Sequence, residues 1–217
     1  MALLKILPEE GAEDFLNGSL YMNTATYFGR IDRTDEVRFD PHDGVHEAIQ
    51  AARVEIMGGN GEWLDLGGVN NPITVRNYAS ERLNVLCLYM ISDRDCDAFD
   101  SRNLSFGDKA ILINNVPHFF ERLRAAAASD GKKIGAGPIE YMDKATHSGR
   151  MGPFRKFHIH SYQNEYRIVV DGGTGSACRL EVGDLRDISA VIASSGIPQL
   201  WAAMRRRGAL KKVALSD

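Results

Sequence analysis

The stretch Asn84-Val-Leu-Cys-Leu-Tyr-Met-Ile-Ser92 indicates the fold class of this chain. It is an almost unbroken apolar run of strand length, which is typical of a central β-strand covered on both faces. The spacing of apolar and turn-forming residues predicts further strands on either side of it. These lie at residues 19–23, 109–114, 137–142, 157–171, 177–182 and 188–193.

A hairpin, two short helices and two longer helices complete the expected elements. The short helices begin at Pro8, with a stop at Asn17-Gly18, and at Thr24. Residues 52–57 and 62–66 alternate in polarity around Gly58-Gly-Asn-Gly61, a strong hairpin signal. Apolar residues recur at helical spacing over Pro117–Ser129, and Pro198–Arg207 begins with proline and is followed by glycine. Hairpins outnumber strand-helix-strand units, so we expect an α+β fold with a curved, mostly antiparallel sheet and helices packed around it.

Composition limits the classes of protein that fit. The 217 residues contain no internal repeat or low-complexity linker, so we expect one domain over residues 1–217. The chain is 44% hydrophobic and 25% charged, ordinary values for a globular protein. A net charge of −3 argues against a wholly basic nucleic-acid binder.

The expected location is the cytoplasm. The sequence has no apolar run long enough to span a bilayer, which excludes a membrane partner, and Met1–Pro8 is too short to be a secretory signal. The three cysteines are widely spaced, which argues against a disulfide framework or a thiolate zinc site.

Residues 30–47 form the most polar stretch of the chain. Arginine, aspartate, glutamate and histidine alternate there with few apolar residues. We expect a surface excursion that buries little.

Chemistry concentrates in residues 152–172. His158 and His160 would share one face of the predicted strand, and Glu165 could complete a 2-His-1-carboxylate metal site. The spacing is similar to the first motif of the cupin barrels, which implies a divalent metal. However, no histidine follows His160 to supply the second cupin motif.

A second interpretation of the same stretch is catalytic. Gln163 and Glu165 resemble the late Gln-x-Glu motif of some ADP-ribosyltransferases, which implies NAD as the cofactor and Glu165 as the catalytic carboxylate that stabilises a developing oxocarbenium ion. Arg30 or Arg33 would bind the cofactor phosphates. A surface ion pair between Glu165 and Arg167 is the simpler structural alternative.

Short motifs at both ends of the chain resemble an uncharacterised family of bacterial and phage proteins, some of them linked to phage defence. That family has Gly-x-Leu-Tyr-Met-Asn near the N-terminus and Lys followed by Tyr-x-x-Glu-x-Arg near the C-terminus. The matching positions are Gly18, Tyr21, Asn23, Tyr27, Phe28, Arg33, Asp35, Lys156, Tyr162, Glu165 and Arg167.

Three functional hypotheses follow. The first is a nucleotide- or nucleic-acid-directed enzyme that uses Glu165 and Gln163, with Tyr162, Arg167, Arg33 and Tyr21 binding the substrate. The second is a cupin-like metal protein that uses His158, His160 and Glu165. The third is a non-catalytic protein that interacts with a phage or host partner.

Overall fold

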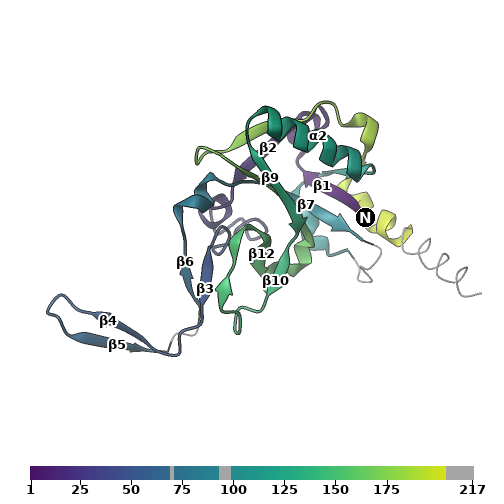
Figure 1. Cartoon of the computed structure of the whole chain (residues 1–217). Coiled ribbons are helices and arrows are strands. Elements are labelled where there is room, and N and C mark those ends of the chain that lie inside the picture. Colours follow the sequence, from purple (N-terminus) through teal and green to yellow (C-terminus); the bar gives the residue numbers. More distant parts are fainter. Residues whose placement is uncertain (69–70, 93–98, 204–217) are drawn as a thin grey trace, which may run out of the picture.

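The computed structural model describes residues 1–68, 71–92 and 99–203 (Figure 1). Within them the chain combines helices with mostly antiparallel strands, which confirms the predicted α+β class. The largest sheet is open rather than closed into a barrel. None of the described helices is long and apolar enough to cross a membrane.

The main sheet has eight strands. Six follow the order β14-β2-β7-β1-β8-β15, while β13 pairs with β7 and β9 pairs with β13. Their bounds are β1 Ala2–Leu7, β2 Ser19–Thr24, β7 Asn84–Ile91, β8 Lys109–Ile113, β9 Lys133–Pro138, β13 Glu165–Asp171, β14 Cys178–Glu181 and β15 Ser189–Ala193.

Strand β7 occupies the centre of this sheet, as its apolar run predicts. Leu86 and Leu88 face one hydrophobic core, and Tyr89 and Ile91 face a second core on the other side. One edge of β7 pairs with β13 over almost its whole length. The other edge pairs with β1 at one end and with β2 at the opposite end.

The first residues of the chain form a strand that the sequence analysis did not predict. Strand β1 is flanked on both sides, by β7 and by β8. Leu3 and Leu4 are fully buried on its two faces, in different cores, whereas Lys5 is its one charged residue. The short N-terminal apolar run is therefore part of the centre of the fold.

Two α-helices, α1 (Glu9–Leu16) and α2 (Val116–Ser129), pack on the first core. Helix α2 matches the predicted helix within one residue, and the side chain of Asn115 caps it by accepting from the backbone N–H of His118. Residues 197–203 are also helical, and the rest of the helix predicted at 198–207 lies outside the described residues.

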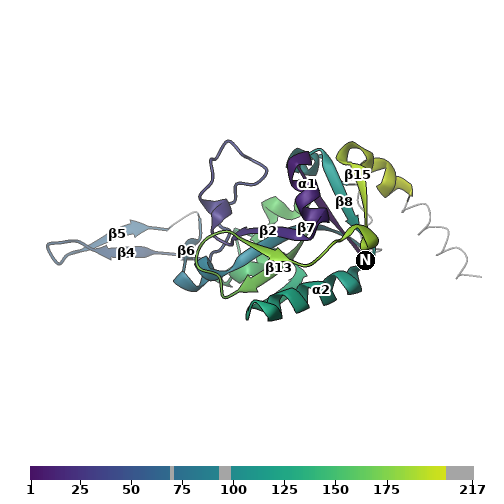
Figure 2. The same cartoon turned by 90° about the horizontal axis from the view of Figure 1, so that it is seen from above.

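Three small sheets surround the main one. They comprise β3 (Glu47–Ile49), β6 (Ile73–Val75) and β11 (Gly149–Arg150); β10 (Glu140–Met142) and β12 (Arg155–Phe157); and β4 (Val54–Met57) and β5 (Trp63–Gly67). The β4–β5 pair is the predicted hairpin, and Figures 1 and 2 show it pointing away from the rest of the protein. The strand predicted at 137–142 is instead two strands, β9 and β10.

The polar excursion at residues 30–47 buries more than its composition suggests. Its last residue, Glu47, begins β3, and Asp40, Asp43 and Val45 are almost completely inaccessible to solvent. The expectation that this segment buries little is therefore wrong, because two of its carboxylates have charged partners inside the protein.

The single strand predicted at 157–171 is also wrong. Strand β12 ends at Phe157, His158–Gln163 form a 3-10 helix, and β13 begins at Glu165. Asn164 makes the break: it has a left-handed φ of 38°, and its side chain donates to the Met90 carbonyl at 2.8 Å. The alternation of side chains along a strand therefore does not predict which way the residues before and after Asn164 face.

Candidate functional site

A fork in the main sheet creates a cavity. Strand β1 leaves β7 after Leu4, and β2 joins β7 only at Asn23. In the described part of the chain, no strand pairs with Leu86–Leu88 on this edge. A cavity of about 620 Å³ fills the gap. We call it the fork pocket; β1, α1, β2 and β7 form most of its wall.

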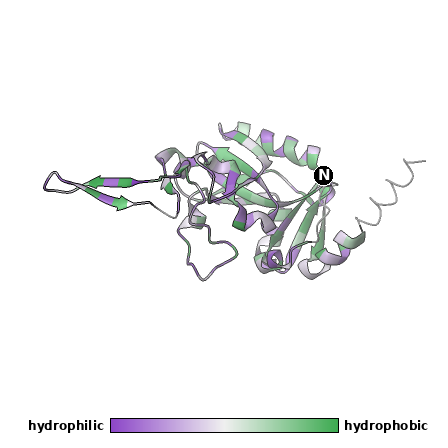
Figure 3. Ribbon diagram, turned by 90° about the horizontal axis from the view of Figure 1, so that it is seen from below, coloured by the Kyte–Doolittle hydropathy of each residue, from purple (hydrophilic) through white to green (hydrophobic). Residues whose placement is uncertain are grey.

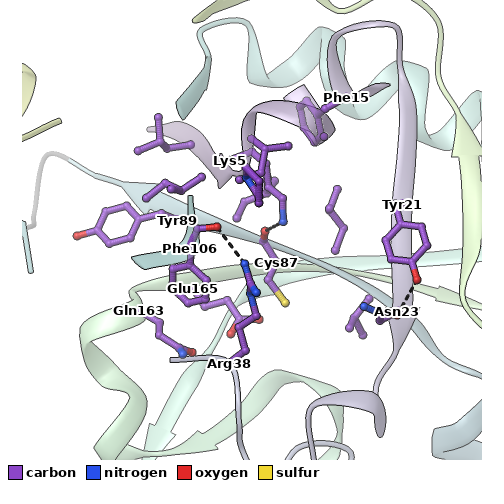
Figure 4. A pocket seen from close by; sticks show the side chains of 18 of the residues that line it. Lys5, Phe15, Tyr21, Asn23, Arg38, Cys87, Tyr89, Phe106, Gln163 and Glu165 are labelled. Carbon is purple, nitrogen blue, oxygen red and sulfur yellow. Dashed lines mark hydrogen bonds between the residues drawn. The ribbon is translucent and has the colours of Figure 1, made fainter. Parts of the chain in front are cut away.

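The side chain of Lys5, on β1, extends into the fork pocket. It donates a hydrogen bond to the part of the β7 edge with which no described strand pairs. Its Nζ donates to the Cys87 carbonyl of β7 at 3.1 Å (Figure 4). Burial lowers the pKa of Lys5, although the nearby charge of Glu165 opposes that shift. Among the described residues, the amine therefore has one hydrogen-bond acceptor, and it borders the cavity.

A second cation, Arg38, comes from the polar excursion. Its guanidinium donates to the Phe106 carbonyl at 3.1 Å and to Asp35 at 3.3 Å, and its side chain stays 38% exposed. Figure 4 shows Arg38 and Lys5 in the same cavity. The two cations come from β1 and from the polar excursion.

Exposed aromatic side chains from β2 and the segment after it also line the pocket. Tyr21 on β2 is 53% exposed and Tyr27 is 41% exposed, and the Tyr27 ring meets the Phe28 ring edge-on at 5.2 Å. The Tyr21 hydroxyl donates to Asn23, and the Arg179 guanidinium stacks 5.7 Å from the Tyr21 ring centre. The pocket thus offers open aromatic faces.

Glu165 borders the pocket from the opposite side of β7. Both of its carboxylate oxygens have cationic partners: Oε1 accepts from Arg167 Nε at 2.6 Å and Oε2 from Lys156 Nζ at 2.8 Å. Burial alone would raise the pKa of Glu165, but these two positive charges outweigh it and hold the pKa well below its usual range. Glu165 is therefore an ionised, nearly buried carboxylate.

Arg167 joins Glu165 to the polar excursion. It is fully buried, and its two terminal nitrogens donate to the two oxygens of Asp43 at 2.9 and 3.0 Å. One of these nitrogens also donates to the Pro153 carbonyl. Arg167 does not line the fork pocket, so it holds Glu165 and the excursion in place from behind.

Lys156 and Asp40 extend this buried charge cluster. Lys156 Nζ donates to Gln163 Oε1 at 2.8 Å and lies 3.9 Å from both Asp40 and Asp43. Burial opposes ionisation of Asp40, but the hydrogen bond from His160 and the charge of Lys156 lower its pKa to about 2. Such a cluster is stable only because each buried charge has a partner.

The structure brings together some of the residues predicted for the catalytic interpretation. Glu165, Gln163 and Tyr21 all line the fork pocket. Tyr162 does not: its ring stacks under the Arg102 guanidinium at 3.8 Å. Arg33 lies near the ring of Phe39 and lines a second cavity. Arg30 pairs with Glu81 on the surface.

The predicted metal ligands are separated. His158 and His160 line the second cavity, of about 480 Å³, and not the fork pocket. They belong to the 3-10 helix, and the oxygens of Glu165 are occupied by two cations. Among the described residues, no group of three or more His, Cys, Asp or Glu side chains is arranged to hold a metal ion.

Several charged residues at or behind the pocket were missing from the predicted site, among them Lys5, Arg38, Asp40 and Asp43. Lys5 carried a signal, because it is a lone charge in the apolar run Ala2–Leu7. Asp43 carried no such signal, since its partner Arg167 is 124 residues away.

No protein-family model, curated protein or solved structure matches this chain.

Proposed function

We propose that the fork pocket binds a nucleotide. The observation that carries this proposal is the pairing of open aromatic faces, those of Tyr21 and Tyr27, with two cationic side chains, Lys5 and Arg38, in one cavity. A nucleotide needs both features, because its base stacks on aromatic rings and its phosphates accept hydrogen bonds from cations.

The phosphate end of the ligand would lie at Lys5 and Arg38. Lys5 has one backbone acceptor, and Arg38 has one backbone acceptor and one partly exposed carboxylate partner. A phosphate between them would add a strong acceptor for both cations, and a guanidinium suits it because it can donate two parallel hydrogen bonds. The lowered pKa of Lys5 would rise as the anion binds.

The base end would lie against Tyr21 and Tyr27. The Tyr21 ring already carries the Arg179 guanidinium at 5.7 Å, so one aromatic and one cationic plane are available for stacking. Asn23, next to the Tyr21 hydroxyl, adds an amide that can donate to or accept from a base edge.

In this proposal Glu165 and Gln163 orient the ligand. The carboxylate stays ionised, as an oxocarbenium-stabilising group must, but Lys156 and Arg167 already neutralise it. A neutralised carboxylate stabilises a developing positive charge less than a free one does. Binding is therefore the core of the proposal, and cleavage of a glycosidic bond, as in an ADP-ribosyltransferase, is a separate outcome of the test.

Isothermal titration calorimetry with ADP, ATP, NAD and ADP-ribose tests the proposal, with adenosine and inorganic phosphate as partial ligands. We expect micromolar-range binding of at least one nucleotide and weaker binding of both partial ligands. Arg38→Gln and Lys5→Met should each weaken binding by about tenfold or more, because each removes a charged hydrogen bond.

Arg124→Gln is the matched control, since Arg124 lies on α2 beside Phe120 and lines neither cavity. It should leave affinity unchanged. Absence of binding for every nucleotide would refute the proposal, as would equal affinity in wild type and Arg38→Gln.

An NAD hydrolysis assay on wild type and Glu165→Gln addresses the catalytic step. Turnover that Glu165→Gln abolishes while ligand affinity is retained would assign Glu165 the catalytic role. Binding without turnover would leave the protein a nucleotide-binding module.

A further inference from the structure

The β4–β5 hairpin forms an arm, residues 54–67, that stands apart from the main sheet. Its strands pair only with each other among the described residues. Figure 1 shows the arm extending away from β3 and β6, Figure 2 shows it projecting beyond β6, and Figure 3 shows apolar residues on both of its strands.

Large apolar side chains are exposed on both faces of the arm. Ile56 and Leu64 are direct cross-strand partners on one face, while Met57 and Trp63 are partners on the other. Leu66 lies at a β-bulge in β5 and is also exposed. Their exposed fractions run from 46% for Ile56 to 64% for Trp63.

An isolated two-stranded ribbon is only marginally stable in water. The polar contacts on this arm are few: Arg53 pairs with Glu55 at 2.8 Å and with Asp65 at 3.0 Å, and all three side chains are exposed. Exposed ion pairs contribute little stability. The arm therefore needs an apolar partner surface.

A second apolar patch lies at the root of the arm. Ile49 on β3 pairs with Ile73 on β6, and Val75 lies two residues further along β6, on the same face. These three side chains are between 38% and 40% exposed. Arm and root together expose roughly 800 Å² of apolar residues, about what each partner buries in a standard protein interface.

We propose that a second copy of this chain covers both patches. Two arms lie antiparallel, so that the tip of each arm, at Met57 and Trp63, packs on the root of the other chain. A two-fold axis makes this contact self-complementary, since every tip meets a root. The face of Met57 and Trp63 also carries the cross-strand pair Glu55 and Asp65, and Arg53 pairs with both carboxylates. The projection of the arm leaves room for the two bodies.

The antiparallel arrangement buries more apolar surface than contact through one face of the arm. Contact between the arms through one face alone would bury roughly half of that area, less than stable interfaces use, and would leave Met57 and Trp63 in water. Overlap of tip and root covers both faces of the arm.

Light scattering coupled to size-exclusion chromatography of the full chain tests the proposal. We expect the mass of two chains for wild type and the mass of one chain for Leu64→Glu and for Ile56→Lys. The matched control is Ile159→Glu, at a 74% exposed isoleucine in the 3-10 helix, which should remain a dimer. Unchanged thermal melting of the main body would show that the variants fold.

A one-chain mass for wild type at the highest soluble concentration would overturn the proposal, and so would a dimer that survives both arm substitutions. Cross-linking tests the geometry: a mixture of Met57→Cys and Val75→Cys chains should form a mixed disulfide, whereas Met57→Cys mixed with Ile159→Cys should not. Failure of the first pair to cross-link, with a dimer present, would exclude the antiparallel overlap.

Discussion

Arg167 and Asp43 form a two-pronged ion pair in which neither side chain reaches solvent, although 124 residues separate them in the sequence. Arg167 belongs to β13, between β7 and β9 in the sheet, and Asp43 to the polar excursion. The pair holds the polar excursion, which also carries Arg38, against the sheet. The shape of the fork pocket therefore depends on a buried charge contact behind it.

Arg167→Met should destabilise the protein by about 3–5 kcal/mol, because it leaves Asp43 and Glu165 buried without their main partner. The measurement is the free energy of unfolding from urea titration. Arg124→Met, on the surface of α2, is the control and should change it by less than about 0.5 kcal/mol.

Adding Asp43→Asn to Arg167→Met should recover part of the loss, since the unpaired charge then disappears. A strictly additive double variant would contradict the account of this pair. So would a fully stable Arg167→Met protein.

The acid sensitivity of the fold should depend on Asp40. The pKa of Asp40 is lowered to about 2, so its contribution to stability is complete above the unfolded value near 4 and disappears as the pH falls towards 2. This contribution is about 2 kcal/mol. Urea titrations between about pH 5 and pH 2 should show a shallower loss of stability in Asp40→Asn than in wild type. Parallel curves would show that the carboxyl is not held ionised.

Cys87 should be an unreactive thiol. Burial, followed by the charge of Glu165, raises its pKa to about 12, against an ordinary value of 9.0. Its thiolate fraction at pH 8 is then roughly a thousandfold below that of a free cysteine. Peptide mass spectrometry after iodoacetamide treatment should find Cys87 modified in denatured protein and almost unmodified in native protein. Native labelling within tenfold of the denatured rate would refute this.

Gly18 should tolerate no side chain. It ends the turn after α1 with φ of +83°, and an added Cβ would lie 1.9 Å from the Gly183 carbonyl oxygen. Gly131, after α2, also has a positive φ but faces open space. Gly18→Ala should therefore cost at least about 3 kcal/mol in unfolding free energy, and Gly131→Ala about 1 kcal/mol. Equal losses would mean that backbone conformation, and not the close contact with Gly183, sets the cost.

Local patterns in the sequence predict several elements well. The apolar run of β7, the helical spacing in α2 and the glycine turn between β4 and β5 each encode their structure over a few residues. Strand β1 escaped prediction because a short run of five apolar residues and one lysine carries no turn signal. The break before β13 escaped because His158–Gln163 alternate like a strand until Asn164 reverses the backbone.

The site is harder to predict than the elements. Glu165, Gln163 and Tyr21 could be selected from short motifs, and all three line the fork pocket. Whether Glu165 is free or paired depends on Lys156 and Arg167, and the position of Arg38 depends on the excursion. Contacts of this kind join distant segments and leave no periodic pattern in the sequence.

The central claim, that the fork pocket binds a nucleotide, is tested most directly by a crystal structure of the protein with ADP. We predict density for the ligand between β1 and β2, with phosphate oxygens within hydrogen-bonding distance of Lys5 and Arg38 and the base against Tyr21 or Tyr27. An empty fork pocket in crystals saturated with ADP, or density only in the second cavity beside His158, would contradict it.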